Sequence, residues 1–147
     1  MQAEYQGMPV FAKRYNPKVQ GSREALQQEY KNFQTHAALQ GDLIPKLHTL
    51  GYHPGTTDPI LILEDCGDAV PEIDGHVKHG FKGAVRNAIT KLHAKTGCCH
   101  GDLRPANMLT SSDSSPCKVM LIDLANMRPA SKQSRAAEAA HFEKLYM

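Results

Sequence analysis

Two short polar segments separated by an apolar run constrain this chain more than any other feature. The first reads His-Gly-Asp-Leu-Arg-Pro-Ala-Asn at residues 100–107, and the second reads Leu-Ile-Asp-Leu-Ala at residues 121–125. Residues 119–122 are all apolar, which is typical of a buried strand. The pattern predicts a polar loop containing Asp102 and Asn107, beside a strand that holds Asp123 rigidly at its end.

These residue types suit one kind of chemistry. Transfer of a phosphoryl group to a hydroxyl requires an acceptor for the hydroxyl proton and oxygen ligands for Mg²⁺. Asp102 can take or orient the proton, while the amide oxygen of Asn107 and the carboxylate of Asp123 can reach a metal ion. An isolated Asp and Asn at this spacing would instead indicate a polar turn. The upstream residues described below favour phosphoryl transfer.

The spacing His-x-Asp-x-x-x-x-Asn, followed by an apolar run and Asp, resembles the catalytic loop and metal-binding motif of the protein kinase-like superfamily. The resemblance implies that Asp102, Arg104 and Asn107 are catalytic residues. It also implies that Asn107 and Asp123 bind Mg²⁺. We expect a structural role for His100, which would bind backbone carbonyl groups near Asp123.

An upstream segment, Val10-Phe11-Ala12-Lys13, resembles the strand whose lysine binds the phosphates of ATP in this superfamily. Glu29 lies on the helix predicted to follow. The resemblance implies that Glu29 pairs with Lys13 and orients its ammonium toward the nucleotide. Glu24 is a second possible partner, but Glu29 stands at the better distance from Gly41, where the helix is expected to end.

The segment Leu61-Ile62-Leu63-Glu64-Asp65-Cys66-Gly67 resembles the last strand of the small lobe and the hinge that follows it. The resemblance implies that backbone groups of Glu64 and Cys66 bind the edge of the adenine ring. It places Leu63 at the back of the nucleotide pocket. With Lys13 and Glu29, these residues complete the predicted nucleotide-binding set.

Composition limits the kind of protein. The chain has 147 residues, of which 41% are hydrophobic and 22% charged, as expected for one soluble globular domain. A net charge of +2 indicates no general attraction to nucleic acid or to anionic membranes. No apolar run approaches the length of a membrane span, and the N-terminus lacks a signal-peptide pattern. The four cysteines form no Cys-x-x-Cys motif, so we expect reduced thiols and a cytoplasmic or nuclear location.

Hydrophobic periodicity and turn residues predict the order of elements. Strands are expected at 8–15, 47–52, 60–64, 107–110 and 118–122, and helices at 23–39, from Phe81 to Gly97 and at 131–146, with a polar turn at 111–116. This order fits an α+β protein with the two-lobe kinase-like fold. Residues 1–147 would form a single domain, with a partial small lobe at 1–65 and a reduced large lobe at 66–147.

The chain departs from the superfamily pattern at both ends. No Gly-x-Gly-x-x-Gly precedes Lys13, and Gly7 is the sole glycine before it. The resemblance thus implies an incomplete small-lobe sheet that begins inside the strand before that of Lys13, in a product that is either trimmed at its N-terminus or a fragment. Only residues 124–147 follow Asp123, with no long activation segment. In these respects the chain is most similar to small fungal protein kinase-like proteins.

Three functions remain open. The first is an ATP- and Mg²⁺-dependent phosphotransferase acting on Ser/Thr hydroxyls of a protein substrate, with no nucleic-acid or membrane partner. The second is a pseudokinase or scaffold, favoured by the missing Gly-rich loop and by Phe11, which would crowd the adenine pocket. The third is a small-molecule kinase of the aminoglycoside or choline type. Such kinases share His-Gly-Asp-Leu but carry a histidine at the position of Arg104.

Overall fold

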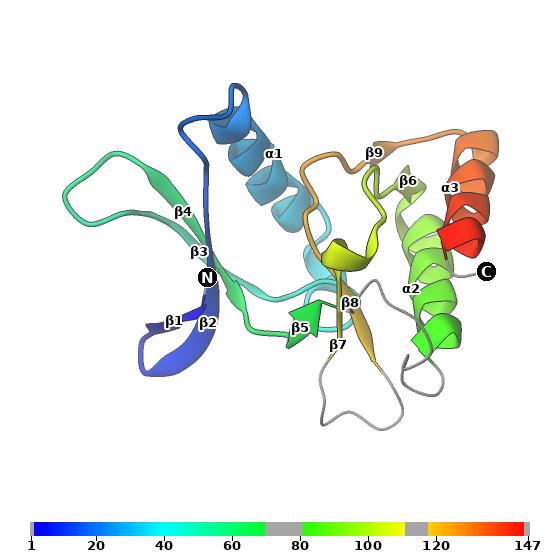
Figure 1. Ribbon diagram of the computed structural model, residues 1–147, viewed down its shortest axis with the longest axis horizontal. Helices are drawn as coiled ribbons and strands as arrows, with labels where there is room; N and C mark the ends of the chain where they lie inside the picture. The colour runs from blue at the N-terminus through cyan, green and yellow to red at the C-terminus, as the bar shows by residue number, and fades with distance from the viewer. Residues whose placement is uncertain (1, 70–80, 111–117, 146–147) are drawn as a thin grey trace.

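The computed structural model describes residues 2–69, 81–110 and 118–145 and consists of helices and antiparallel sheets. The predicted α+β class is therefore confirmed. The elements are β1 (Gln2–Tyr5), β2 (Met8–Arg14), α1 (Ser22–Thr35), the 3₁₀ helix η1 (Ala37–Leu39), β3 (Leu47–Tyr52), β4 (Pro59–Glu64), β5 (Asp68–Ala69), α2 (Phe81–Thr96), β6 (Cys98–Cys99), the 3₁₀ helix η2 (Pro105–Asn107), β7 (Met108–Thr110), β8 (Val119–Leu121), β9 (Arg128–Pro129) and α3 (Lys132–Leu145). The four-stranded sheet lies at one end of the molecule, α2 and α3 lie at the other, and α1 lies between them (Figure 1).

The largest sheet has the strand order β1-β2-β4-β3, with antiparallel pairing between neighbours. Strand β2 therefore has a partner on both sides, which fixes Lys13 opposite Leu61. Strand β1 occupies the place before the Lys13 strand where the resemblance implies the end of another strand. It pairs with β2 through a two-residue turn, in which Gln6 and Gly7 both have positive φ. Such turns match the natural twist of a β-hairpin.

Helix α1 buries four side chains on one face, namely Leu26, Glu29, Asn32 and Phe33. Their spacing is that of an amphipathic helix, but two of the four are polar. A buried polar group needs a hydrogen-bond partner, so this face must meet polar groups of another element. Those groups belong to the segment after β8, described below.

The prediction that this helix runs over 23–39 is wrong at its end. Helix α1 stops at Thr35, because His36 leaves helical geometry with φ −109° and ψ 37°. The chain then forms η1, in which the Leu39 and Gln40 N–H groups bind carbonyl groups three residues back. Gly41 follows with φ +82°, so the predicted stop lies after this tighter turn.

The other sheets are small and surround the polar loop. Strands β5, β7 and β8 form one sheet, and β6 pairs with β9. The loop that contains Asp102 connects β6 to β7 through η2. Strand β8 is tied to the N-terminal part of the chain, because the Leu121 N–H donates to the Leu43 carbonyl at 2.9 Å. The polar turn predicted at 111–116 lies outside the described residues.

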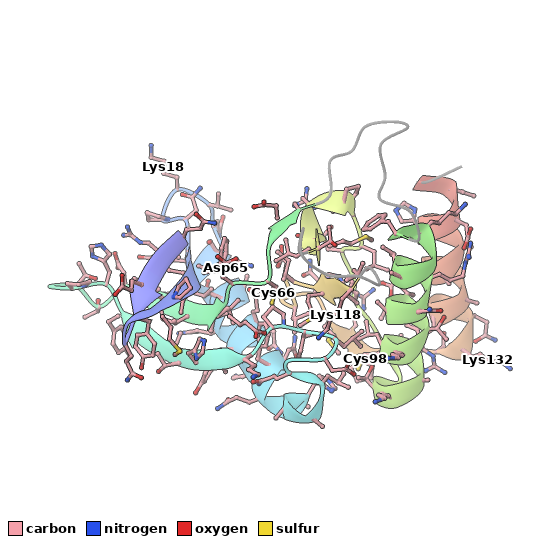
Figure 2. The ribbon with its side chains drawn as sticks, turned by 90° about the horizontal axis from the view of Figure 1, so that it is seen from below. Lys18, Asp65, Cys66, Cys98, Lys118 and Lys132 are labelled. Atoms are coloured by element: carbon pink, nitrogen blue, oxygen red, sulfur yellow. The ribbon has the colours of Figure 1, made fainter. Side chains whose placement is uncertain are left out.

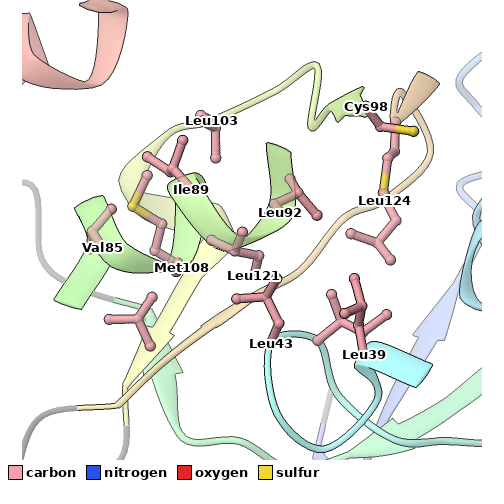
Figure 3. Packing of buried hydrophobic residues seen from close by; sticks show 14 of the residues in the cluster. Leu39, Leu43, Val85, Ile89, Leu92, Cys98, Leu103, Met108, Leu121 and Leu124 are labelled. Carbon is pink, nitrogen blue, oxygen red and sulfur yellow. The ribbon is translucent and has the colours of Figure 1, made fainter. Parts of the chain in front are cut away.

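One cluster of buried side chains joins elements from both ends of the molecule. It includes Leu26 and Phe33 from α1, the α2 stripe predicted from periodicity, and Leu121 and Leu124 around β8. Figure 3 shows part of this packing around Leu121. Burying each large side chain contributes about 1.5–3 kcal/mol. The shared core fixes the sheet relative to the polar loop. None of the helices within the described ranges is long and apolar enough to cross a membrane.

Candidate active site

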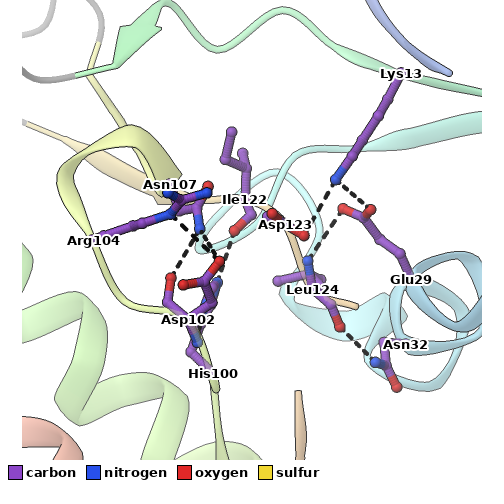
Figure 4. A network of polar contacts seen from close by, with 10 residues as sticks. All are labelled: Lys13, Glu29, Asn32, His100, Asp102, Arg104, Asn107, Ile122, Asp123 and Leu124. Atoms are coloured by element: carbon purple, nitrogen blue, oxygen red, sulfur yellow. Dashed lines mark hydrogen bonds and ion pairs between the residues drawn. The ribbon is translucent and has the colours of Figure 1, made fainter. Parts of the chain in front are cut away.

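A lysine lies between two carboxylates, one from helix α1 and one from the segment after β8 (Figure 4). The Nζ atom of Lys13 is 2.7 Å from Oε2 of Glu29 and 3.3 Å from Oδ1 of Asp123. The predicted ion pair between Lys13 and Glu29 is therefore confirmed. The Glu29 side chain is only 1% exposed, whereas Asp123 is 28% exposed. The lysine thus reaches from a buried carboxylate toward one that is open to solvent.

The pKa values of this cluster shift for different reasons. Burial alone would lower the pKa of the Lys13 ammonium, but the carboxylates of Glu29 and Asp123 outweigh burial and raise it. Burial raises the pKa of the Glu29 carboxyl, and the Lys13 ammonium offsets this effect only in part. The ion pair thus stabilises the charged form of Lys13, whereas desolvation disfavours the charged form of Glu29.

The loop after β6 brings together the three predicted catalytic residues. The Asn107 amide nitrogen donates to the Asp102 backbone carbonyl at 2.8 Å and to Asp102 Oδ2 at 3.1 Å. Arg104 Nε lies 3.5 Å from the same Oδ2, in an ion pair that is largely exposed. Because the Asn107 nitrogen is engaged, its amide oxygen remains for another ligand.

His100 links this loop to the segment that carries Asp123. Its Nε2 donates to the Ile122 carbonyl at 2.7 Å, and its Nδ1 accepts the Asp102 N–H at 3.2 Å. The expectation that His100 binds a backbone carbonyl near Asp123 is confirmed. The Ile122 N–H donates in turn to the Asn107 carbonyl at 3.0 Å. Asp102, Asn107 and Asp123 are therefore held on one connected network.

Asp123 itself has a strained backbone, with φ +61°. Positive φ is uncommon outside glycine and costs about 1–2 kcal/mol, although Asp and Asn tolerate it best. Strain of this kind persists where surrounding bonds enforce it, and it is concentrated at functional sites. The two predicted metal ligands, the Asp123 carboxylate and the Asn107 amide, both offer oxygen atoms. They fit Mg²⁺ better than zinc.

A cavity of about 190 Å³ lies against the connection after β4. Its walls are Gly41, Glu64, Asp65, Cys66, Gly67, Lys118 and Met120. Figure 2 shows Asp65, Cys66 and Lys118 in the middle of the molecule. Of the predicted nucleotide-binding residues, Glu64 and Cys66 line this cavity, whereas Leu63, Lys13 and Glu29 are not part of its wall. Burial and then Glu64 raise the pKa of the Cys66 thiol to about 12, so the thiol stays protonated at neutral pH.

Glu138, which no sequence pattern singled out, supports the polar loop from helix α3. Its Oε1 accepts the His100 N–H at 3.0 Å and its Oε2 accepts the Gly101 N–H at 2.9 Å. His93 Nε2 donates to the same Oε1 at 2.8 Å. Because an Ala-rich helix with scattered charges gives no reason to single out one glutamate, the sequence carried no signal for this role.

Three potential metal ligands, His93, Cys99 and Glu138, also lie together, with ligand atoms within 4.8 Å of one another. Hydrogen bonds already account for the Glu138 carboxylate. Both of its oxygens accept N–H groups, and one of them also binds the His93 ring. We therefore interpret this cluster as a hydrogen-bonded support for the loop.

Glu138→Gln is expected to destabilise the fold by about 1–3 kcal/mol near neutral pH, because an amide cannot accept at both positions. Burial alone would raise the pKa of the Glu138 carboxyl, but the Gly101 N–H, His93 and the His100 N–H outweigh burial and lower it. A lowered carboxyl pKa stabilises the fold above the ordinary value of 4.5, and this contribution is lost as pH falls through the lowered pKa.

Urea unfolding at about pH 7 and about pH 3 tests this, with Glu24→Gln on the exposed face of α1 as the matched control. The difference between wild type and Glu138→Gln should shrink at the lower pH. The control should stay within about 0.5 kcal/mol at both. A Glu138→Gln difference that does not depend on pH would contradict the charged role of Glu138.

Comparison with known proteins agrees with this geometry. The model of the lipopolysaccharide kinase (Kdo/WaaP) family matches residues 58–147, which is more than half of the chain. The match includes the loop with Asp102, Arg104 and Asn107, as well as Asp123, but it begins after Lys13 and Glu29. A search of curated proteins finds no match. The chain belongs to the lipopolysaccharide kinase (Kdo/WaaP) family, which consists of kinase-like phosphotransferases.

Proposed function

We propose that the protein is an ATP- and Mg²⁺-dependent phosphotransferase that phosphorylates a hydroxyl group of a saccharide of the lipopolysaccharide type. One observation supports this most strongly. Lys13, from a part of the chain outside the family match, bridges Glu29 and Asp123 at 2.7 and 3.3 Å. A lysine fixed by a buried carboxylate and directed at the predicted metal carboxylate is the arrangement that phosphate binding requires.

In this proposal the sheet with β1–β4, together with α1, forms a small lobe, and the remaining elements form a large lobe. Lys13 binds the phosphates of ATP, and Glu29 orients its ammonium. The adenine ring lies near Leu63, with its edge against the backbone of Glu64 and Cys66. These nucleotide contacts rest on the superfamily resemblance.

Asp102 would act on the acceptor hydroxyl. The hydroxyl oxygen forms a bond to the γ-phosphorus, the bond from that phosphorus to the β–γ bridging oxygen breaks, and ADP leaves. Asp102 takes the hydroxyl proton, and Asn107 keeps its carboxylate in place. Arg104 supplies a planar cation beside this carboxylate, suited to an anionic group on the acceptor or to the transferred phosphate.

The oxygens of Asp123 and Asn107 would hold Mg²⁺, which when bound neutralises charge on the phosphates. The Ile122 backbone just before Asp123 is held by bonds to His100 and Asn107, and the Asn107 side chain is held through its amide nitrogen. Both ligands are therefore oriented before the nucleotide arrives. Such preorganisation is the main contribution that a protein makes to phosphoryl transfer.

The family name supports a saccharide acceptor over the Ser/Thr hydroxyl of a protein. The purified chain should be incubated with Mg²⁺ and ATP labelled at the γ-phosphate, with bacterial lipopolysaccharide in one reaction and a mixed Ser/Thr peptide library in another. We expect label in the saccharide fraction and none when Mg²⁺ is chelated. Asp102→Asn is the matched inactive control.

The alternative outcomes separate the competing functions. Label in the peptides alone would overturn the saccharide acceptor and favour the protein kinase. ATP binding without transfer to either acceptor would favour a pseudokinase or scaffold.

A further inference from the structure

Helix α1 holds both backbone polar groups of the residue that follows Asp123. The Leu124 N–H donates to Glu29 Oε1 at 3.1 Å, and the Leu124 carbonyl accepts from Asn32 Nδ2 at 2.6 Å. Asn32 Nδ2 also donates to the Met127 carbonyl at 3.2 Å. Asn32 is 8% exposed, so these bonds lie in the interior. One amide therefore binds two carbonyl groups of the same loop.

The residue before Asp123 is held from the opposite side. Ile122 donates its N–H to the Asn107 carbonyl at 3.0 Å and accepts from His100 Nε2 at 2.7 Å. Asp123, with φ +61°, thus lies between two restrained residues. Ile122 is hydrogen-bonded to the polar loop, and Leu124 is hydrogen-bonded to α1. A strained residue needs restraint on both sides, since otherwise it relaxes to a common conformation.

We propose that Asn32 is a positioning residue, which sets the direction of the Asp123 carboxylate by locking the following backbone to α1. This inference rests on the proposed function, because it concerns the same metal site. Glu29, which holds Lys13, lies one turn earlier on the same helix. A single helix therefore orients the phosphate-binding lysine and the metal-binding carboxylate together.

The hydrogen bonds from Glu29 and Asn32 to the loop also oppose movement of α1. A shift of the helix away from the loop would remove the bonds of the buried Asn32 amide to the Leu124 and Met127 carbonyls, although the Leu124 carbonyl would keep the Met127 N–H at 3.1 Å. Each buried group left unpaired costs about 1–3 kcal/mol. Helix α1 and the segment 123–127 therefore move as one body, and the metal site stays assembled when no nucleotide is bound.

Asn32→Asp tests the role of the amide with little change in shape. It removes both donors and places a carboxylate against two carbonyl oxygens, so the segment after Asp123 must shift. Gln27→Glu is the matched control, because it makes the same amide-to-acid change on the exposed face of the same helix. Calorimetry on the full chain would give the Kd of ATP with Mg²⁺ and with EDTA, and a thermal melt would verify folding.

We expect Asn32→Asp to weaken Mg²⁺-ATP binding by about tenfold or more, while metal-free ATP binding changes less than about twofold. Gln27→Glu should leave both within about twofold. If Asn32→Asp does not fold, Asn32→Ala removes the donors without adding charge, and a smaller loss confined to Mg²⁺-ATP is expected. Equal losses with and without Mg²⁺, or no loss, would overturn the positioning role.

The same measurements separate this inference from the proposed function. A wild-type chain whose ATP affinity does not respond to Mg²⁺ would overturn both, before any variant is compared. A wild-type chain that binds Mg²⁺-ATP but transfers no phosphate would overturn the phosphotransferase alone. The loss specific to Mg²⁺-ATP in Asn32→Asp would then still support the positioning role.

Discussion

Asp123→Asn is expected to reduce Mg²⁺-dependent phosphoryl transfer by about 1,000-fold or more while leaving the fold intact. The substitution removes a negative charge that would hold the metal ion, and metal-assisted charge stabilisation is most of what such an enzyme supplies. Asparagine tolerates positive φ as well as aspartate does, so the strained backbone at φ +61° should survive the change.

The Asp123 variant has a second effect, on Lys13. The loss of one of its two carboxylates lowers the lysine's pKa relative to wild type, although Glu29 still holds the ammonium. Initial rates at saturating ATP and Mg²⁺ measure the expected loss, and a urea melt verifies folding. The exposed Asp42→Asn is the matched control and should keep wild-type rates. Turnover by Asp123→Asn within about tenfold of wild type would remove Asp123 as a metal ligand.

Gly101→Ala is expected to cost about 3 kcal/mol or more of stability and to abolish activity. Gly101 has φ +91°, and a Cβ there would lie 2.4 Å from the Asn126 carbonyl oxygen. The Asn126 backbone cannot easily retreat, because Asn32 holds the carbonyls of Leu124 and Met127 on either side of it. The polar loop would have to move instead, which would carry Asp102 with it.

A second glycine separates backbone strain from steric conflict. Gly55 also has positive φ, at +75°, but a Cβ there meets nothing within 4 Å. Gly55→Ala should therefore cost only the backbone term of about 1–2 kcal/mol. Urea unfolding of both variants gives the difference. If the two substitutions lower the free energy of unfolding equally, the close approach between Gly101 and Asn126 does not contribute to the cost of Gly101→Ala.

Sequence patterns predicted the elements whose periodicity was clear. The α2 stripe, the β3–β4 hairpin and strand β2 formed as expected, because each alternates or repeats over several residues. The predicted end of α1 was wrong. Its apolar residues continue at a helical spacing through η1, but the hydrogen bonds of η1 join residues three rather than four positions apart. Strand β1 followed only from the resemblance and without bounds, because a short exposed strand has little apolar alternation.

The site was predicted where residues carry chemistry in a recognisable order, and missed where they act through the backbone. The Lys13–Glu29 pair and the His100 contact followed from the resemblance. Asn32 and Glu138 bind main-chain groups that only the folded chain brings near them, so their own sequence neighbourhoods gave no signal. The similarity to small fungal kinase-like proteins and the truncation at the N-terminus stay predictions.

The bonds from α1 to the Leu124 backbone also have a consequence for how the protein is made. The Glu29–Leu124 bond spans 95 residues. During synthesis the first sheet and α1 leave the ribosome long before their partners, and chains emerge at about 5–20 residues per second. For several seconds the Glu29 carboxylate and the Asn32 amide, which the finished fold buries, face water rather than the Leu124 backbone. The N-terminal part is therefore exposed to chaperones during this interval, and the contacts between α1 and the Asp123 segment form only after residue 124 has emerged.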